Sequence, residues 1–398
     1  MRDSIDHDRS CWSVFLIFLK LGLTSFGGPV AHLGYFREEF VSRRRWLSEH
    51  SYADLVALCQ FLPGPASSQV GMALGLSRAG YAGALSAWAG FTLPSAIVLI
   101  LFALGISEYG ELVSGGVLHG LKVVAVAVVA QAVWGMGKSL CPDWPRKMLA
   151  VLTTAWVLLV PSAWSPLAVI LLGAVAGLLW LHPTAKDSSD ELSVSVSPRV
   201  GVLCFALFLV LLLGLPVLAY SVGGQALAMI DSFYRAGALV FGGGHVVLPL
   251  LQAEVVGPGW ISNDVFVAGY GAAQAVPGPL FTFSAFLGAS MNSSPTGWFG
   301  GLIALLAIFL PSFLLVAAAL PFWQQVRSNV RAQAALAGVN AAVVGLLLAA
   351  LYQPVWTSAI EQPADILLAA AALLALMYFK SPAWLVVIGS ALIAGVLA

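Results

Sequence analysis

The chain has 398 residues, of which 60% are hydrophobic and only 9% are charged, whereas about 25% of the residues of an ordinary soluble domain are charged. This composition excludes a typical soluble protein and is characteristic of a chain that lies in a lipid bilayer. Lysine and arginine together number 18, as do aspartate and glutamate, so the net charge favours neither nucleic acid nor an acidic partner. The four cysteines lack the spacing of a metal site or a disulfide frame, and we expect no metal and no cofactor.

Apolar segments of spanning or near-spanning length succeed one another along the chain. Since a bilayer requires roughly 20 residues per helix, some of them are too short to cross it. With two further segments that flank a repeated Pro-Gly-Pro tripeptide, the pattern predicts an all-α polytopic membrane protein with about 13 transmembrane or re-entrant helices. The remaining segments begin near Trp12, Tyr81, Leu112, Met148, Leu167, Val200, Ala226, Trp298, Ala332, Ile366 and Ala383.

One polar stretch divides the chain. It runs from His182 to Arg199 and is rich in serine and charged residues, which is typical of a solvated linker. The sequence therefore predicts an N-terminal repeat at residues 1–182, a linker with one extra transmembrane helix at residues 183–225, and a C-terminal repeat at residues 226–398.

The two halves are copies of one another. FLKLGLTSFGG from Phe18 matches FYRAGALVFGG from Phe233, and the match pairs Lys20 with Arg235. Further matches follow in the same order: WLS at Trp46 with WIS at Trp260, LPS at Leu93 with LPS at Leu310, and Gly120 and Lys122 with Gly338 and Asn340. Several matches in one order indicate a duplication, and duplicated membrane proteins typically enclose a site between repeats that contain broken helices.

The extra helix predicts that the second repeat is inverted in the membrane. A single helix between two homologous halves places the second half upside down. The loop charges agree in part, because Arg43, Arg44 and Arg45 follow the first helix and favour the cytoplasmic side. The matching loop of the second half offers Glu254 and Asp264 and no cation.

The Pro-Gly-Pro tripeptides predict a break in the helix at equivalent places of the two halves. Proline lacks an N–H group and suits the first turn of a new helix, and such a break survives in a bilayer only where it is buried in protein or lines a cavity. The new helix would direct its free N–H groups into that cavity, which suits an anion. An alternative is a proline kink that only shapes packing. The candidate binding residues are Gln60, Pro63, Gly64, Pro65, Ser67, Ser68 and Gln69, with Gln274, Pro277, Gly278, Pro279, Thr282 and Ser284 in the second half.

A second pair of breaks consists of glycines. Consecutive glycines allow successive N–H groups to converge on an anion, although glycines also occur where membrane helices pack closely. The candidates are Phe26, Gly27 and Gly28 in SFGGP, with Gly242, Gly243, Gly244 and His245 in VFGGGH.

Three cations in apolar surroundings predict the sign of the ligand. Lys20, Lys122 and Arg235 are costly in a bilayer and are functional candidates, which favours an anion. Alternatives are that the lysines extend to the membrane surface and that Arg235 pairs with Asp231, four residues earlier. Histidines beside the glycine breaks, His32 and His245, could titrate or donate to a ligand, or could be packing or interfacial residues. Four carboxylates could carry protons: Glu38, Glu39, Asp54 and Glu254.

The combination of FGGP with FGGG, RRWLS with GWIS, QFLPGP with QAVPGP, and the two LPS motifs resembles the chromate ion transporter family of bacterial inner-membrane proteins, in its long two-domain form. The resemblance covers nearly the whole chain. It implies export of chromate, a tetrahedral dianion similar to sulfate, by alternating access and driven by the membrane potential or the proton gradient. The second copy differs at Asn340, where the first has Lys122, and at Gly244, where the first has Pro29, so the site is expected to be asymmetric.

Other functions remain open on the sequence alone. The same scaffold could carry sulfate or another oxyanion, act as an anion channel, or serve as a scaffold without transport. A membrane-embedded enzyme is disfavoured because HExxH, GxSxG and Walker A motifs are absent. The physiological substrate, the coupling ion and the oligomeric state are not determined, and a homodimer is compatible with the sequence.

Overall fold

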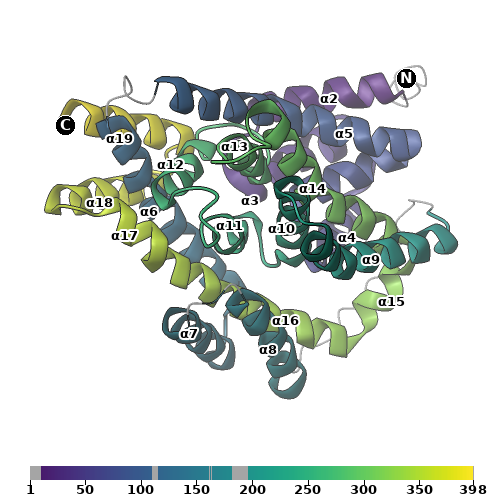
Figure 1. Ribbon diagram of the computed structural model, residues 1–398. Helices are drawn as coiled ribbons and strands as arrows, with labels where there is room; N and C mark the ends of the chain where they lie inside the picture. Colours follow the sequence, from purple (N-terminus) through teal and green to yellow (C-terminus); the bar gives the residue numbers. More distant parts are fainter. Residues whose placement is uncertain (1–9, 110–114, 161, 163, 182–195, 398) are drawn as a thin grey trace.

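The computed structural model describes residues 10–109, 115–160, 162, 164–181 and 196–397. Within these ranges the chain is helical with short connections (Figure 1), which confirms the all-α prediction. The polar linker expected at residues 182–199 lies outside the described residues except for its last four positions.

The first half contains the helices α2 (Cys11–Thr24), α3 (Gly28–Arg37), the π-helical η1 (Glu38–Arg43), α4 (Glu49–Phe61), α5 (Ala66–Tyr109), α6 (Gly115–Leu140), α7 (Trp144–Leu159) and α8 (Ser165–Trp180). The helix α9 (Pro198–Val222) follows.

The second half contains α10 (Gln225–Leu239), η2 (Gly244–Val246), α11 (Val247–Val255), α12 (Asn263–Ala273), η3 (Leu280–Thr282), α13 (Phe283–Ala289), α14 (Gly297–Ala319), η4 (Leu320–Phe322), α15 (Trp323–Ser328), α16 (Val330–Ala350), η5 (Leu351–Trp356), α17 (Thr357–Ala359), α18 (Pro363–Met377) and α19 (Ala383–Leu397).

Five helices of the described residues are long and apolar enough to cross a bilayer, and one of them, α9, has an exposed apolar face. They are Ala66–Glu108, Gly115–Leu140, Pro198–Val222, Gly297–Phe322 and Val330–Ala359. On α9, Leu203, Val210 and Leu213 are exposed by 68%, 65% and 69%. Such a contiguous apolar surface is rare on a soluble monomer. The chain is therefore a multi-pass membrane protein.

The repeated WLS and WIS motifs supply helix caps at equivalent positions. The side chain of Ser48 accepts a hydrogen bond from the backbone N–H of Ser51 at the start of α4. In the same way Ser262 accepts from the N–H of Val265 at the start of α12. A serine at this position satisfies one of the N–H groups that a helix start leaves free, so the motif fixes where each of the two helices begins.

Each Pro-Gly-Pro motif lies at the tip of a helical hairpin. Non-helical backbone at Ala79 and Gly80 divides α5 into segments 66–78 and 81–109. The guanidinium of Arg78, at the end of the first segment, lies 4.8 Å from the ring centre of Trp46, just before α4. In the second half the N–H of Asn292, after α13, donates to the carbonyl of Trp260, before α12. The chain thus turns back at each motif, and both ends of each hairpin meet.

The glycine breaks are the tips of a second pair of hairpins. Phe18 on α2 contacts Phe36 on α3 and Phe40 in η1, with ring centres 5.6 Å and 5.1 Å apart. In the second half Arg235 on α10 pairs with Glu254 on α11 at 3.0 Å. Each half therefore begins with two hairpins, one closed by glycines and one by Pro-Gly-Pro.

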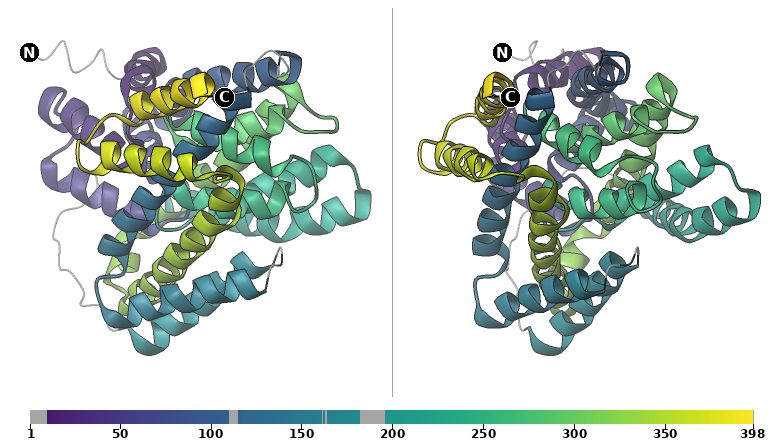
Figure 2. Two further views of the ribbon diagram at one scale, coloured as in Figure 1. Left: turned by 90° about the vertical axis from the view of Figure 1, so that its left-hand side faces the viewer. Right: turned by 60° about the vertical axis from the view of Figure 1, so that its left-hand side comes forward.

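The last hairpin of each half packs on a long helix of the other half. The helices α7 and α8 lie along α16, and α18 and α19 lie along α6 (Figures 1 and 2). Gly338 on α16 packs against Gly173 and Gly177 on α8, and Gly120 on α6 packs against Ser390 on α19. Small residues let membrane helices approach closely, so this exchange joins the two halves over much of their length.

Close backbone contact also holds the first helix of each half. A side chain on Gly22 of α2 would meet α5, because its Cβ would lie 2.7 Å from the carbonyl oxygen of Gly90. The equivalent Gly237 of α10 lies against the carbonyl of Ile308 on α14. The two contacts repeat one another, as the sequence match predicts.

We expect Gly22→Ala to destabilise the protein by about 1–3 kcal/mol, because the added methyl group overpacks the contact between α2 and α5. Gly135→Ala on α6 is the matched control, since no heavy atom lies within 4 Å of its Cβ position. Thermal unfolding of the purified proteins in detergent would measure the difference. An equal melting temperature for the two variants would contradict the packing described.

Candidate functional site

The four helix breaks meet, and their backbones exchange hydrogen bonds between the halves. The N–H of Gly64, in the first Pro-Gly-Pro motif, donates to the carbonyl oxygen of Val240 at 2.7 Å. The N–H of Gly278, in the second, donates to the carbonyl oxygen of Ser25 at 2.9 Å. Val240 and Ser25 begin the glycine breaks of the opposite halves. Each Pro-Gly-Pro motif thus docks on the glycine break of the other half.

The LPS motifs complete this exchange. A Cβ on Gly64 would lie 2.6 Å from the hydroxyl of Ser312, and one on Gly278 would lie 2.9 Å from the hydroxyl of Ser95. The two glycines have φ angles of +119° and +98°, a region that side-chain-bearing residues rarely adopt. Glycine is therefore required at both places by conformation and by space.

The glycine breaks face each other across the centre. A Cβ on Gly244 would lie 3.1 Å from Cγ of Pro29, and a Cβ on Gly28 would lie 3.9 Å from Nε2 of His245. Pro29 and Gly244 are equivalent positions of the two repeats. Because equivalent positions of the two repeats are in contact here, the approximate two-fold axis that relates the halves passes through this point. Glycine at position 244, in place of the proline of the first repeat, leaves room for the Pro29 ring.

Buried polar side chains without a hydrogen-bond partner gather at these breaks. Ser25, Thr92, Ser284 and Ser312 are fully buried, and Ser68 is 3% exposed. Buried polar groups are almost always hydrogen-bonded, so each exception needs a physical explanation. The atoms without a partner at or beside the breaks are Ser25 Oγ, His32 Nε2, Ser68 Oγ, Gln69 Oε1, Thr92 Oγ1, Gln274 Nε2, Ser284 Oγ and Ser312 Oγ.

The start of α5 adds free backbone donors. The first N–H group of this helix to find a helical partner is that of Gln69, which donates to the carbonyl of Pro65. The N–H groups of residues 66–68 come earlier and have no carbonyl one turn before them. The side-chain amide of Gln69 also donates, from Nε2, to the carbonyl of Pro63 at 2.7 Å. This bond stabilises the turn of the first Pro-Gly-Pro motif.

The second motif differs from the first. A short 3-10 turn follows it, and the Thr282 hydroxyl donates to the carbonyl of Pro279 at 2.8 Å. The hydroxyl of Thr282 is therefore used within the turn, whereas Ser68 at the first motif is unpaired. At the second motif the unpaired donors are instead Gln274 Nε2 and Ser284 Oγ, so both halves offer donors to a ligand.

The two histidines lie at the junction in different surroundings. Nδ1 of His32 lies 3.4 Å from the hydroxyl of Ser67, and the residue is 1% exposed. Nδ1 of His245 lies 2.7 Å from the hydroxyl of Tyr270. Tyr270, Thr92 and Ser95 were not singled out from the sequence, and only the LPS repeat offered a signal for one of them.

Two of the predicted cations do not present a free charge to the breaks. Lys20 is exposed on α2 and makes no ion pair with any described residue. Arg235 is held by Asp231 at 2.7 Å and by Glu254 at 3.0 Å. Phe26, next to the first glycine break, packs against Trp384 of α19, and Gln60 is exposed at the end of α4.

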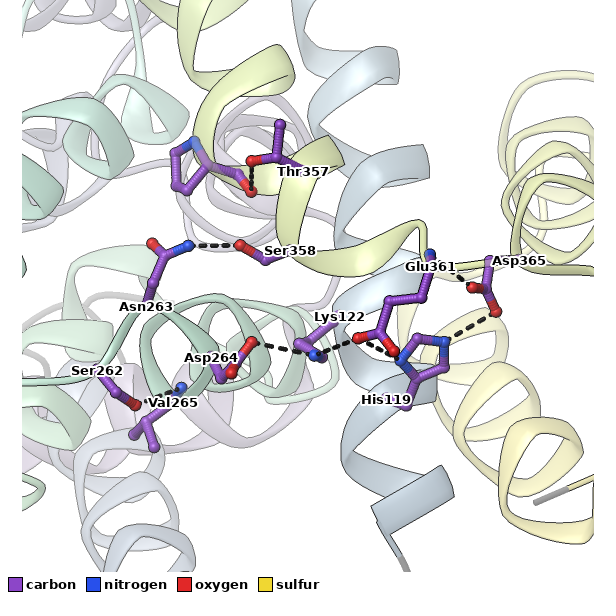
Figure 3. Close-up of polar contacts among 11 residues, drawn as sticks. His119, Lys122, Ser262, Asn263, Asp264, Val265, Thr357, Ser358, Glu361 and Asp365 are labelled. Carbon is purple, nitrogen blue, oxygen red and sulfur yellow. Dashed lines mark hydrogen bonds and ion pairs between the residues drawn. The ribbon is translucent and has the colours of Figure 1, made fainter. Parts of the chain in front are cut away.

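The third cation belongs to a separate cluster between the halves (Figure 3). Nζ of Lys122 on α6 lies 3.0 Å from Asp264 on α12 and 3.3 Å from Glu361 before α18. One turn away, Nε2 of His119 lies 2.8 Å from Asp365. These residues line a cavity of about 720 Å³ that no Pro-Gly-Pro or glycine-break residue lines. At the position equivalent to Lys122, the side-chain oxygen of Asn340 has no partner.

The carboxylates named as proton carriers are mostly engaged. Burial alone would raise the pKa of Glu39, but hydrogen bonds from Arg44 and Arg43 outweigh it and hold this pKa below its usual value. Asp54 lies beside His50, and Glu254 pairs with Arg235. Glu39 is therefore ionised at neutral pH and anchors the basic loop.

A multi-pass membrane protein built from two repeats, with a polar junction of broken helices between them, has the organisation of a secondary transporter. Residues 12–178 and 227–396 match the family described as chromate transporter. The chain belongs to this family, which consists of transporters and not enzymes.

Its relatives match over most of their length. It is 29% identical over 348 residues to the chromate transport protein of Pseudomonas aeruginosa, which covers 84% of this chain and 78% of that protein. It is 27% identical over 355 residues to the probable chromate transport protein of Synechococcus elongatus, with 88% and 86% covered. It is 26% identical over 384 residues to the chromate transport protein of Cupriavidus metallidurans, with 95% and 91% covered. No solved structure matches the chain significantly.

We expect Gly64→Ala to lower stability more than Gly80→Ala. Both glycines have positive φ, but only Gly64 also lies against Ser312, whereas Gly80 has no heavy atom within 4 Å of its Cβ position. A backbone held in a sparsely populated positive-φ region costs roughly 1–3 kcal/mol for a residue with a side chain, and crowding adds to it for Gly64. Thermal unfolding in detergent would compare the two. A smaller loss for Gly64→Ala would contradict the docking of the motif.

Proposed function

We propose that the protein exports chromate across the bacterial inner membrane as a secondary active transporter, by alternating access around the junction of the four breaks. Membership of the chromate transporter family supports the substrate. The observation that carries the proposed site is the group of buried, unpartnered polar side chains at that junction. Sulfate, a dianion of the same shape, is expected to compete.

The chemistry of the junction suits a tetrahedral oxyanion. Hydroxyl groups such as that of Ser68 can donate to oxygen without carrying a charge. The N–H groups at the start of α5 add further donors and the positive end of the helix dipole. The glycines leave the backbone accessible, and Gly27 itself is exposed. Several neutral donors that surround four equivalent oxygens replace the hydration of the anion.

Hydrogen bonds rather than fixed charges dominate the proposed site. Lys20, without an ion-pair partner among the described residues, can balance the charge of the anion as it approaches. Arg235 and Lys122 contribute only when their carboxylate partners release them. A site with little net charge binds a dianion weakly enough to release it again, as a transporter requires.

We propose that the repeats are inverted in the membrane. Each half forms hairpins or pairs of helices, so its ends return to one side, and α9 alone is left between the halves. One crossing between two such halves turns the second upside down. The arginine-rich loop at residues 43–45 then faces the cytoplasm.

Purified protein in lipid vesicles is expected to show saturable chromate flux that an imposed pH gradient or membrane potential drives against its concentration gradient, and sulfate should reduce it. Radiolabelled chromate measures this flux directly. Protein-free vesicles give the leak rate. Absence of flux would reject chromate as substrate, and flux that neither saturates nor concentrates the anion would indicate a channel.

Replacing one unpartnered hydroxyl tests where the anion binds. We expect Ser68→Ala to raise the KM for chromate by roughly 10- to 100-fold, because a hydrogen bond to a charged group contributes about 1.5–3 kcal/mol. Ser77→Ala on the same helical segment is the control, since that hydroxyl donates to the carbonyl of Leu74. An unchanged KM in Ser68→Ala would remove this residue from the site.

A further inference from the structure

The two halves are alike in sequence but differ in how their Pro-Gly-Pro hairpins pack. In the second half α12 lies along α6, with Gly271 against the backbone of Leu121. In the first half α4 makes no comparable contact with α16, although both helices are fully described. Gly271 lies seven residues before Gly278, as Ala57 lies seven before Gly64, and Leu121 corresponds to Val339. A strictly symmetric protein would therefore bring Ala57 against Val339.

On α4, the face that would make this contact is exposed. Ala53, Ala57 and Gln60 lie on one face of α4 and are exposed. Their equivalents on α12 are Val267, Gly271 and Gln274, of which the first two are buried and the third is half-buried. The same face is thus closed in one half and open in the other.

An ion cluster holds the closed side (Figure 3). Asp264 is the second residue of α12, and its bond to Lys122 ties the start of this helix to α6. The bonds of Lys122 to Glu361 and of His119 to Asp365 tie α18 to α6 as well. We call the ion pairs Lys122–Asp264, Lys122–Glu361 and His119–Asp365 the latch. Between α4 and α16, Asn340 stands in place of Lys122 and His50 in place of Asp264, so the Lys122–Asp264 pair has no counterpart there.

We infer that the structure is one of two related arrangements of the halves, and that the Lys122–Asp264 ion pair is the gate that stabilises the present one. In the other arrangement α12 leaves α6, and the exposed face of α4 closes on α16, with Ala57 against Val339. The side chain of Asp264 is 71% exposed and that of Lys122 is 12% exposed, so Asp264 can move into solvent while Lys122 keeps Glu361 as its second partner. This inference rests on the proposed alternating access, because exchanging the two packings opens the junction from opposite sides.

Cysteine cross-linking tests the second arrangement. In a variant with Cys11, Cys59, Cys141 and Cys204 replaced by serine, Ala57→Cys and Val339→Cys are combined. A short bifunctional thiol reagent is added in vesicles with chromate, and cross-linked peptides are measured by mass spectrometry. We expect the pair to cross-link and the cross-link to arrest transport, while each single cysteine variant stays active and unlinked.

Removing the latch should shift the balance between the arrangements. Lys122→Asn makes α6 resemble α16 at this position, and we expect it to raise the Ala57–Val339 cross-linking yield several-fold. Asp264→Asn should do the same from the other partner, at an exposed position that folding tolerates. Lys138→Asn, on the same helix but stacked on Trp134, is the matched control and should leave the yield unchanged.

The outcomes separate this inference from the proposed function. If the active double-cysteine protein never cross-links, the second arrangement is wrong. If it cross-links but neither latch variant changes the yield, the Lys122–Asp264 pair is not the gate. The yield does not depend on which anion is carried, so cross-linking without chromate flux would reject the substrate and retain the two arrangements.

Discussion

The structure depends on the need to satisfy backbone groups at helix breaks buried within a membrane protein. In lipid an unpaired N–H or carbonyl group has no water to bind. Here each break finds its partner on the other half, through the bonds of Gly64 to Val240 and of Gly278 to Ser25. Neither half can satisfy these groups alone, so the breaks bring the halves together at one central junction.

The same constraint explains the residues around the junction. Glycine occupies positions 64 and 278 because a Cβ there would collide with a serine of the opposite half. The LPS serines, Ser95 and Ser312, lie against these glycines from the long helices α5 and α14. Polar side chains left without partners there give the proposed site its neutral, donor-rich character. Two of the cations are paired away from these groups: Lys122 joins α12 to the long helix α6, and Arg235 joins the two helices of the α10–α11 hairpin.

Much of the fold and of the candidate site could be predicted from the sequence, because it depends on residues that are close together in the chain. The repeats and the breaks follow from the repeated motifs and from the chemistry of proline and glycine. That the Pro-Gly-Pro elements turn back could not be decided, since the contact of Arg78 with Trp46 joins residues far apart in the chain.

The sequence could not reveal which residues distant in the chain meet in the fold. Arg235 had a visible local partner in Asp231, but its second partner, Glu254, depends on the fold of the α10–α11 hairpin. Lys122 looked like a free cation because Asp264 and Glu361 are far from it in sequence. The exchange of the last hairpins between the halves has no local signal at all.

The position of a bound oxyanion tests the central claim most directly. Crystals grown with chromate and measured at the chromium absorption edge would show where the metal atom lies. We expect an anomalous peak at the junction of the four breaks, with the chromate oxygens within hydrogen-bonding distance of the Ser68 hydroxyl and the first N–H groups of α5. A single peak in the cavity beside Lys122 and His119, with none at the junction, would contradict it.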